Sequence, residues 1–137
     1  MSRSGLLIPK DLYEQVCQHC LQSYPNEACG ILSGKNGKVN RVYTVKNIEP
    51  SPVSYFMDPR EQLMIHKELR QRNEDMVAIF HSHPQSPAYP SAKDVNLAFY
   101  EDTLYVIVSL SDGCISEMKA YSIVEGTVSE IMITMTG

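Results

Sequence analysis

The stretch that most constrains the fold is a short apolar segment, residues 76–80, which runs directly into His81-Ser82-His83. Its apolar, partly β-branched composition predicts a buried strand. Residues two apart in a strand point to the same face, so we expect His81 and His83 side by side, with Ser82 facing away. Any fold of this chain must therefore end a buried strand on a pair of imidazoles.

The segment after the histidines predicts a rigid loop followed by a helix. Three prolines between residues 84 and 90 exclude a helix there. Ser91-Ala92-Lys93-Asp94 is typical of a helix start, with Ser91 at the N-cap and Asp94 at the third helical position. A chain that leaves the strand and returns as a helix can bring Asp94 back against the two histidines.

Two neutral imidazoles and one carboxylate form a ligand set that leaves a fourth position open, as in catalytic rather than structural zinc sites. The simpler alternative is that Asp94 only caps its helix and that each histidine is a hydrogen-bonded residue at a strand end. The combination of His-x-His at a strand end with a carboxylate in the next helix favours metal. We expect one zinc ion per chain, bound by His81, His83 and Asp94.

His81-x-His83 followed by Ser91-x-x-Asp94 resembles the JAMM motif of the MPN-domain zinc metallopeptidases. The family pattern also implies an upstream glutamate, and Glu27 matches it in the form typical of short, stand-alone bacterial members. The resemblance covers essentially the whole chain, so it implies a single domain over residues 1–137. The implied fold is the α/β MPN fold, a mixed, curved sheet flanked by helices and similar to that of cytidine deaminases.

The resemblance implies a role for each matching residue. The two histidines and Asp94 would hold zinc, which lowers the pKa of a bound water from 15.7 to roughly 7. Glu27 would act first as general base and then as general acid. Ser91 would donate a hydrogen bond to the oxyanion, an effect typically worth ~3 kcal/mol. Helix capping is the alternative role for Ser91.

The implied reaction is hydrolysis of a peptide or isopeptide bond after the Gly-Gly tail of a ubiquitin-like or sulfur-carrier protein. Some family members release a terminal amino acid such as cysteine from that tail. A tail without side chains can enter a narrow groove, and it can also pair with a sheet edge. Whether this chain prefers peptide or isopeptide bonds is left open.

Three alternatives remain open at this point. A non-catalytic MPN scaffold usually lacks ligands or the glutamate, whereas this chain has them all. A RadC-like domain linked to DNA metabolism carries a similar motif, but Ser82 between the histidines favours the peptidase branch. A zinc deaminase would need a glutamate within the histidine motif and a downstream Pro-Cys-x-x-Cys, and the sequence has neither.

Composition narrows the expected partners and location. A net charge of −4 gives no reason to expect nucleic acid or an anionic membrane as a partner. The apolar run at residues 6–8 stops at Pro9, unlike a signal peptide, and the apolar segment at 104–110 is too short to span a bilayer. We therefore expect a cytoplasmic protein with reduced cysteines; a homodimer is left open.

Cys17 and Cys20 form a Cys-x-x-Cys pair, but no second pair exists to complete a structural zinc site. They belong to a helical stripe, so we expect core residues rather than a redox motif. That stripe consists of Tyr13, Val16, Cys17, Cys20 and Tyr24. The role of Cys29, two residues after Glu27, is left open. We expect His66 to be a surface or hydrogen-bonded residue of a helix rather than a catalytic one.

The remaining pattern predicts the order helix, two strands, helix, strand, helix, three strands. A hairpin turn is expected at Asn36-Gly37, and Asp58-Pro59 is typical of a helix start. Helices are expected at 9–24, 58–73 and 91–100, and strands at 29–33, 39–45, 76–80, 104–108, 115–124 and 128–134. A short additional strand is expected at 55–57.

Overall fold

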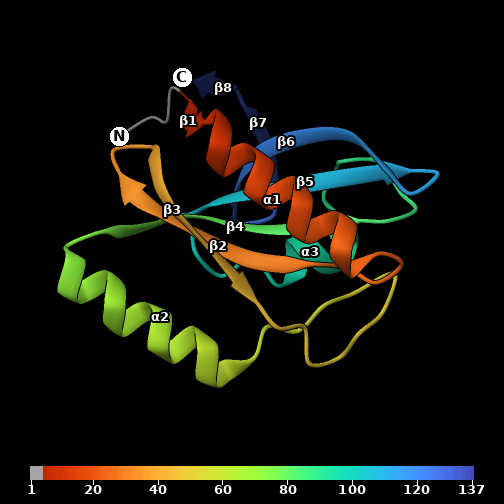
Figure 1. Ribbon diagram of the computed structural model, residues 1–137, viewed down its shortest axis with the longest axis horizontal. Helices are drawn as coiled ribbons and strands as arrows, with labels where there is room; N and C mark the ends of the chain where they lie inside the picture. Colours follow the sequence, from red (N-terminus) through yellow and green to blue (C-terminus); the bar gives the residue numbers. More distant parts are fainter. Residues whose placement is uncertain (1–4) are drawn as a thin grey trace.

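Strand β4 (Asp75–His83), which carries both histidines, lies inside the sheet rather than at its edge. Over residues 5–137, the range that the computed structural model describes, the sheet has eight strands in the order β7-β6-β5-β4-β2-β3-β1-β8 (Figure 1). The other elements are β1 (Leu6–Pro9), α1 (Lys10–Ser23), β2 (Cys29–Lys35), β3 (Lys38–Val45), α2 (Pro59–Arg72), α3 (Ala92–Asn96), β5 (Leu104–Ser111), β6 (Cys114–Val124), β7 (Thr127–Ile131) and β8 (Ile133–Thr136).

The sheet is mixed, as the sequence predicted. β4 pairs in parallel with β5 and antiparallel with β2. Parallel neighbours need a crossover connection, and the proline-containing loop together with α3 supplies it between β4 and β5. The end of β4 and the start of α3 therefore belong to the same connection, which is the geometry that the predicted site requires.

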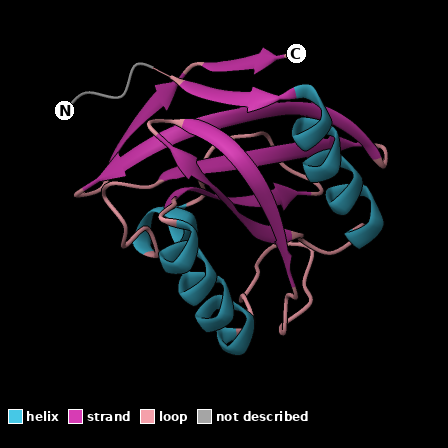
Figure 2. Ribbon diagram, turned by 60° about the vertical axis from the view of Figure 1, so that its left-hand side comes forward, coloured by secondary structure: helices cyan, strands magenta, loops and turns pink. Residues whose placement is uncertain are grey.

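The two faces of the sheet carry separate apolar cores. One core joins α1 to Phe80 of β4, and the other joins α2 to Ile79. Figure 2 shows the two long helices on opposite sides of the twisted sheet. Since side chains alternate along a strand, His81 and His83 point to the same face as Ile79. The site therefore lies on the α2 face of the sheet.

Local sequence signals set one turn and one helix start as predicted. Asn36 and Gly37 have φ values of 52° and 78°, the left-handed pair that a two-residue hairpin between β2 and β3 requires. At the start of α2, Asp58 Oδ1 accepts a hydrogen bond from the Arg60 N–H at 2.9 Å, and Pro59 is the first helical residue. Both predictions are confirmed.

The sequence analysis missed β1 and placed Pro9 inside the first helix. Pro9 is instead the N-cap of α1, with extended φ and ψ values of −60° and 146°. Residues 6–9 form a strand because they pair in parallel with residues 133–136 of β8. A segment this short becomes a strand only through its partner, which lies at the other end of the described chain.

Two further boundaries differ from the prediction. α3 ends at Asn96 rather than Tyr100, and the Tyr100 N–H donates to the Tyr105 hydroxyl oxygen at 3.1 Å instead of to a helical carbonyl. Residues 55–57 contribute one isolated bridge, between Asn47 and Met57, rather than a strand. None of the helices within residues 5–137 is both long and apolar enough to cross a membrane.

The single strand predicted at 128–134 is two strands at opposite ends of the sheet order. β7 pairs with β6, β8 pairs with β1, and only Met132 separates β7 from β8. The Met132 carbonyl accepts a hydrogen bond from the Leu6 N–H at 2.8 Å. Because one residue links the two ends of the sheet order, the sheet curves so that β7 and β8 lie near each other (Figure 1).

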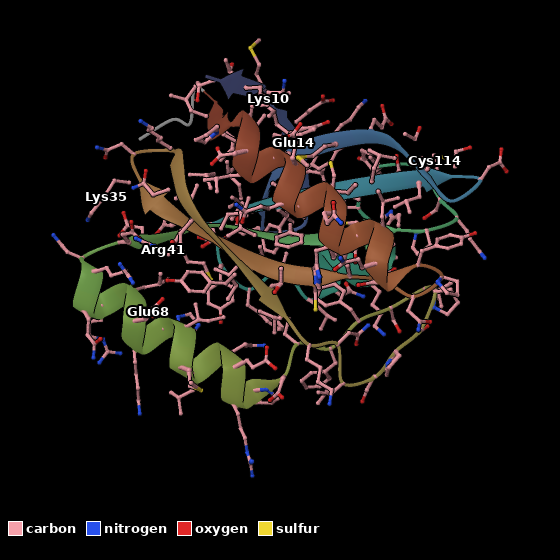
Figure 3. All side chains as sticks on the ribbon, viewed as in Figure 1. Lys10, Glu14, Lys35, Arg41, Glu68 and Cys114 are labelled. Carbon is pink, nitrogen blue, oxygen red and sulfur yellow. The ribbon has the colours of Figure 1, made fainter. Side chains whose placement is uncertain are left out.

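The cysteines follow the core prediction with one correction to the helical stripe. Cys20 is fully buried against the sheet and Cys17 is half-buried, but Tyr24 stands at the C-cap of α1 and is 42% exposed. Cys114 is exposed at the tip of the β5–β6 turn (Figure 3). All four thiols of the chain are free within the described range.

Candidate metal centre

Ser82, between the two histidines, fixes the position of the segment that carries Glu27. The Ala28 N–H donates to Ser82 Oγ at 2.8 Å, and the Ser82 N–H donates to the Ala28 carbonyl at 3.0 Å. Ala28 therefore pairs with Ser82, and the antiparallel register places Glu27, the preceding residue, opposite His83. The strand pattern predicted that Ser82 faces away from the histidines, but it did not predict this anchoring role.

Three ligand atoms form a nearly equilateral triangle. His81 Nε2 lies 3.1 Å from His83 Nε2 and 3.2 Å from Asp94 Oδ2, and His83 Nε2 lies 3.0 Å from Asp94 Oδ2. A tetrahedral zinc ion 2.0–2.1 Å from its ligands separates them by about 3.3 Å. The triangle and its two-nitrogen, one-oxygen donor set therefore fit a zinc-sized ion with an open fourth position.

The two imidazoles are held by different contacts. His83 Nδ1 lies 2.8 Å from the Pro87 carbonyl, so it carries the proton and leaves the Nε2 lone pair free for a ligand. His81 instead stacks on Tyr55, with ring centroids 4.8 Å apart, and its buried Nδ1 has no hydrogen-bond partner in residues 5–137. Burial lowers the pKa of His81, which favours the neutral form that binds metal.

Ser91 and Asp94 form a reciprocal capping box at the start of α3. Ser91 Oγ accepts from the Asp94 N–H at 3.1 Å, while the Ser91 N–H donates to Asp94 Oδ2 at 2.9 Å. The capping role, the alternative that the sequence left open for Ser91, is therefore present. It uses the oxygen of Ser91 as an acceptor, so the hydroxyl proton remains available for donation.

Glu27 is a buried acid beside the cluster. It is 5% exposed, and its Oε1 has no hydrogen-bond partner among the described residues. Burial, the largest cause, raises the pKa of Glu27 to about 8. A carboxyl group with a pKa near neutrality can both accept and donate a proton at physiological pH.

Asn47 holds the backbone of Glu27 and was missed by the sequence analysis. Its Nδ2 donates to the Glu27 carbonyl at 3.1 Å, and its Oδ1 accepts from the N–H groups of Glu49 and Phe56 at 3.1 and 3.0 Å. The Glu27 N–H in turn donates to the Ser51 carbonyl at 2.8 Å. An asparagine at the start of a proline-containing loop was the available signal.

The other two histidines of the sequence lie outside the cluster. His66 is half-buried on α2. His19 Nε2 lies 3.1 Å from the Cys29 carbonyl and packs edge-on against Phe80, on the α1 face of the sheet. Cys29 itself is buried, with its thiol 3.5 Å from the Val45 carbonyl.

Comparison with known proteins identifies the family of this chain. The family described as prokaryotic homologs of the JAB domain matches residues 9–124. The chain belongs to this family. The JAB-domain protein is 39% identical over 127 residues to the CysO-cysteine peptidase of Mycobacterium tuberculosis, covering 91% of this chain and 87% of the relative. Membership of the family, predicted from the JAMM motif, is confirmed.

Two further relatives of the JAB-domain protein are each 35% identical to it. The probable TtuB-protein conjugate cleaving protease of Thermus thermophilus aligns over 122 residues, 88% of this chain and 78% of the relative. The desampylase of Pyrococcus furiosus aligns over 135 residues, 98% and 93% of the two chains. The predicted enzyme class, a peptidase or isopeptidase, is supported by these names.

Solved structures agree with the fold of the JAB-domain protein. A solution structure of a protein from Desulfitobacterium hafniense has a TM-score of 0.84 and 38% identity, covering 96% of this chain and 92% of the other. A JAB1/MPN domain protein from Archaeoglobus fulgidus has a TM-score of 0.61 at 18% identity, covering 96% and 99%. The second likeness shows the fold alone, and the predicted MPN fold is confirmed.

Proposed function

We propose that this protein is a zinc-dependent peptidase that cleaves the amide bond after the Gly-Gly tail of a ubiquitin-like or sulfur-carrier protein. The observation that carries the proposal is the triangle of His81, His83 and Asp94 ligand atoms, 3.0–3.2 Å on each side, next to the buried acid Glu27. A catalytic zinc site needs these features: three protein ligands, an open position and a proton carrier.

The substrate class is supported by the names of the relatives. One is a CysO-cysteine peptidase and another cleaves TtuB-protein conjugates. Each name describes a protein joined either to an amino acid or to another protein. An amide bond at the end of such a protein is the shared target that we propose for this chain.

The roles of the residues follow from their environments. A zinc ion at this site supplies Lewis-acid activation of water. Glu27 accepts the proton that water loses and donates it to the nitrogen of the leaving amine, because its pKa near neutrality suits both transfers. Ser91 uses its free hydroxyl proton to stabilise the developing oxyanion, while its oxygen caps α3.

The first experiment measures zinc content and hydrolysis in parallel on wild type, Asp94→Ala and Glu27→Gln. Wild type is expected to hold about one zinc per chain. Asp94→Ala loses zinc and activity together, since it removes a ligand. Glu27→Gln keeps the zinc but loses a factor of about 10²–10⁴ in the rate constant kcat, the usual contribution of a general acid–base residue. Glu101→Gln, an exposed acid away from the cluster, is the matched control.

Zinc-free wild type after reconstitution would contradict the proposal and leave the scaffold alternative. Stoichiometric zinc in Asp94→Ala would show that the ligand assignment is wrong. Loss of zinc in Glu27→Gln would contradict the separation between the proton carrier and the ligands.

A further inference from the structure

We propose that Lys93 binds the α-carboxylate of the leaving residue, so that the preferred substrate is a Gly-Gly tail extended by one amino acid. The inference rests on the proposed function and specifies its leaving group. It distinguishes release of a free amino acid from cleavage of an isopeptide bond to a lysine side chain, a choice that the sequence left open.

The first observation is a pocket beside the ligand triangle. Its polar lining includes His81, Asp94 and a single ammonium group, that of Lys93. The rest of the lining is largely apolar or aromatic: Tyr55, Pro90, Leu97, Tyr105, Ile107 and Ile123. Apolar walls and one cation next to the reacting centre complement a side chain and a carboxylate held together, which is the form of a free amino acid.

The second observation is the position of Lys93 itself. It lies between Ser91 and Asp94 in the first turn of α3, so its backbone is fixed by the capping box. It is exposed, and no acid within residues 5–137 forms an ion pair with it. Its charge nevertheless reaches the reacting centre, because it opposes the burial that raises the pKa of Glu27. An unpaired cation in this place is available to a ligand.

The chemistry of the tail then assigns the pocket to the leaving side. Glycine has no side chain, so the two residues before the scissile bond need a groove but no side-chain pocket. The residue after the bond does have a side chain and, when terminal, a carboxylate two bonds from the nitrogen that leaves. Asp94, which stays ionised, would repel that carboxylate, and Lys93 is the group that offsets the repulsion.

The same geometry disfavours an isopeptide. There the leaving nitrogen is at the end of a lysine side chain, and the backbone carbonyl of that lysine is an amide several bonds away. Hydrolysis consumes one water in either case: the C–N bond breaks, the carbonyl carbon gains hydroxide and the nitrogen gains a proton. Only the terminal amino acid presents a carboxylate to Lys93 during that step.

The test compares two peptides that end in Gly-Gly-Ala, one with a free carboxylate and one with a terminal carboxamide. We expect zinc-loaded wild type to prefer the carboxylate about 10–100-fold in kcat/KM, the range of a charge-assisted hydrogen bond. Lys93→Met should abolish this preference, and Lys93→Arg should retain most of it. Lys67→Met, an exposed lysine on α2, is the matched control.

Binding in the Glu27→Gln background gives a second readout that needs no turnover. Calorimetry should show the carboxylate peptide bound about 10-fold more tightly than the carboxamide, and Lys93→Met should make the two dissociation constants equal. Equal kcat/KM and equal binding for both peptides in wild type would overturn the role of Lys93 while leaving the proposed function in place. If neither peptide is hydrolysed, the proposed function fails, and the binding result still decides the role of Lys93.

Discussion

Glu27 and Asp94 are two acids in one site whose surroundings shift their pKa values in opposite directions. Burial raises the pKa of Glu27 to about 8. Burial acts the same way on Asp94, but hydrogen bonds to His81 and His83 outweigh it and lower the pKa of Asp94 well below its usual range. Two acids whose pKa values are separated in this way suit different tasks. Asp94 stays ionised as a ligand, and Glu27 carries the proton.

Two buried thiols give a prediction for stability at alkaline pH. Burial raises the pKa of Cys20 and of Cys29 from 9.0 to about 12 in the folded protein. The stability that results is complete below pH 9 and is lost as the pH rises from 9 towards 12, because only the unfolded thiols ionise there. The free energy of unfolding should fall by up to about 1.4 kcal/mol per pH unit for each thiol.

Denaturant unfolding between pH 8.5 and 10.5 measures this slope. Cys20→Ala should reduce it, because one of the two groups is gone. Cys114→Ala should leave it unchanged, since that thiol is exposed in the folded protein. Equal slopes in wild type and Cys20→Ala would show that burial of this thiol does not control alkaline stability.

At the scale of elements, local signals were sufficient where a segment carries its own capping or turn residues. The start of α2 at Asp58-Pro59 and the turn at Asn36-Gly37 were both predicted, and β4 runs on from the predicted 76–80 to include His83. The ligand cluster was predicted for the same reason, because its residues flank one strand–loop–helix connection. β1 and the break at Met132 were missed, since both depend on pairing between distant segments.

The loop between β3 and α2 shows the same limit within the site. Asn47 and Tyr55 lie far from the JAMM motif in sequence, yet one holds the backbone of Glu27 and the other stacks on His81. The local pattern marks Asn47 as the start of a proline-containing loop, but it does not indicate which backbone group the side chain contacts. Their roles follow only from the folded arrangement, in which this loop lies against the segment just before β2.

Asn47→Asp tests whether this loop positions the proton carrier. The substitution keeps an oxygen that can accept from Glu49 and Phe56 but removes the donor to the Glu27 carbonyl. We expect unchanged zinc content and a fall of about 10–100-fold in kcat, because small displacements of a catalytic group are costly. Asn40→Asp, which alters an exposed asparagine bonded to Glu74, is the control. Wild-type kcat in Asn47→Asp would exclude the positioning role.

At the scale of the whole molecule, the last strand of the chain covers the edge of the first. β7 and β8 stand at the two ends of the strand order, and β8 pairs with β1. Unpaired strand edges are templates for pairing with other chains. The contacts along the β1–β8 seam are four residue pairs between the two strands and the hydrogen bond from the Leu6 N–H to the Met132 carbonyl.

Removing residues 132–137 should therefore expose the edge of β1 that β8 covers. If each of the four β1–β8 pairs contributes roughly 0.5–1.5 kcal/mol, the free energy of unfolding falls by about 2–6 kcal/mol. Thermal unfolding measures the loss, and size-exclusion chromatography should reveal association through the exposed strands. Removing Gly137 alone is the control. A truncated protein that stays as stable and as monodisperse as the full chain would contradict the protective role of this seam.

The seam also sets the order in which the protein can be completed during synthesis. β1 leaves the ribosome early, but its principal partner, β8, is made only after every other described strand. Until then the inward side chains of Leu6 and Ile8, fully buried in the finished fold, lack the neighbour that covers them. Closing such a distant pair is a slow step in folding. The metal ligands on β4 and α3 are therefore all synthesised before the sheet that supports them can close.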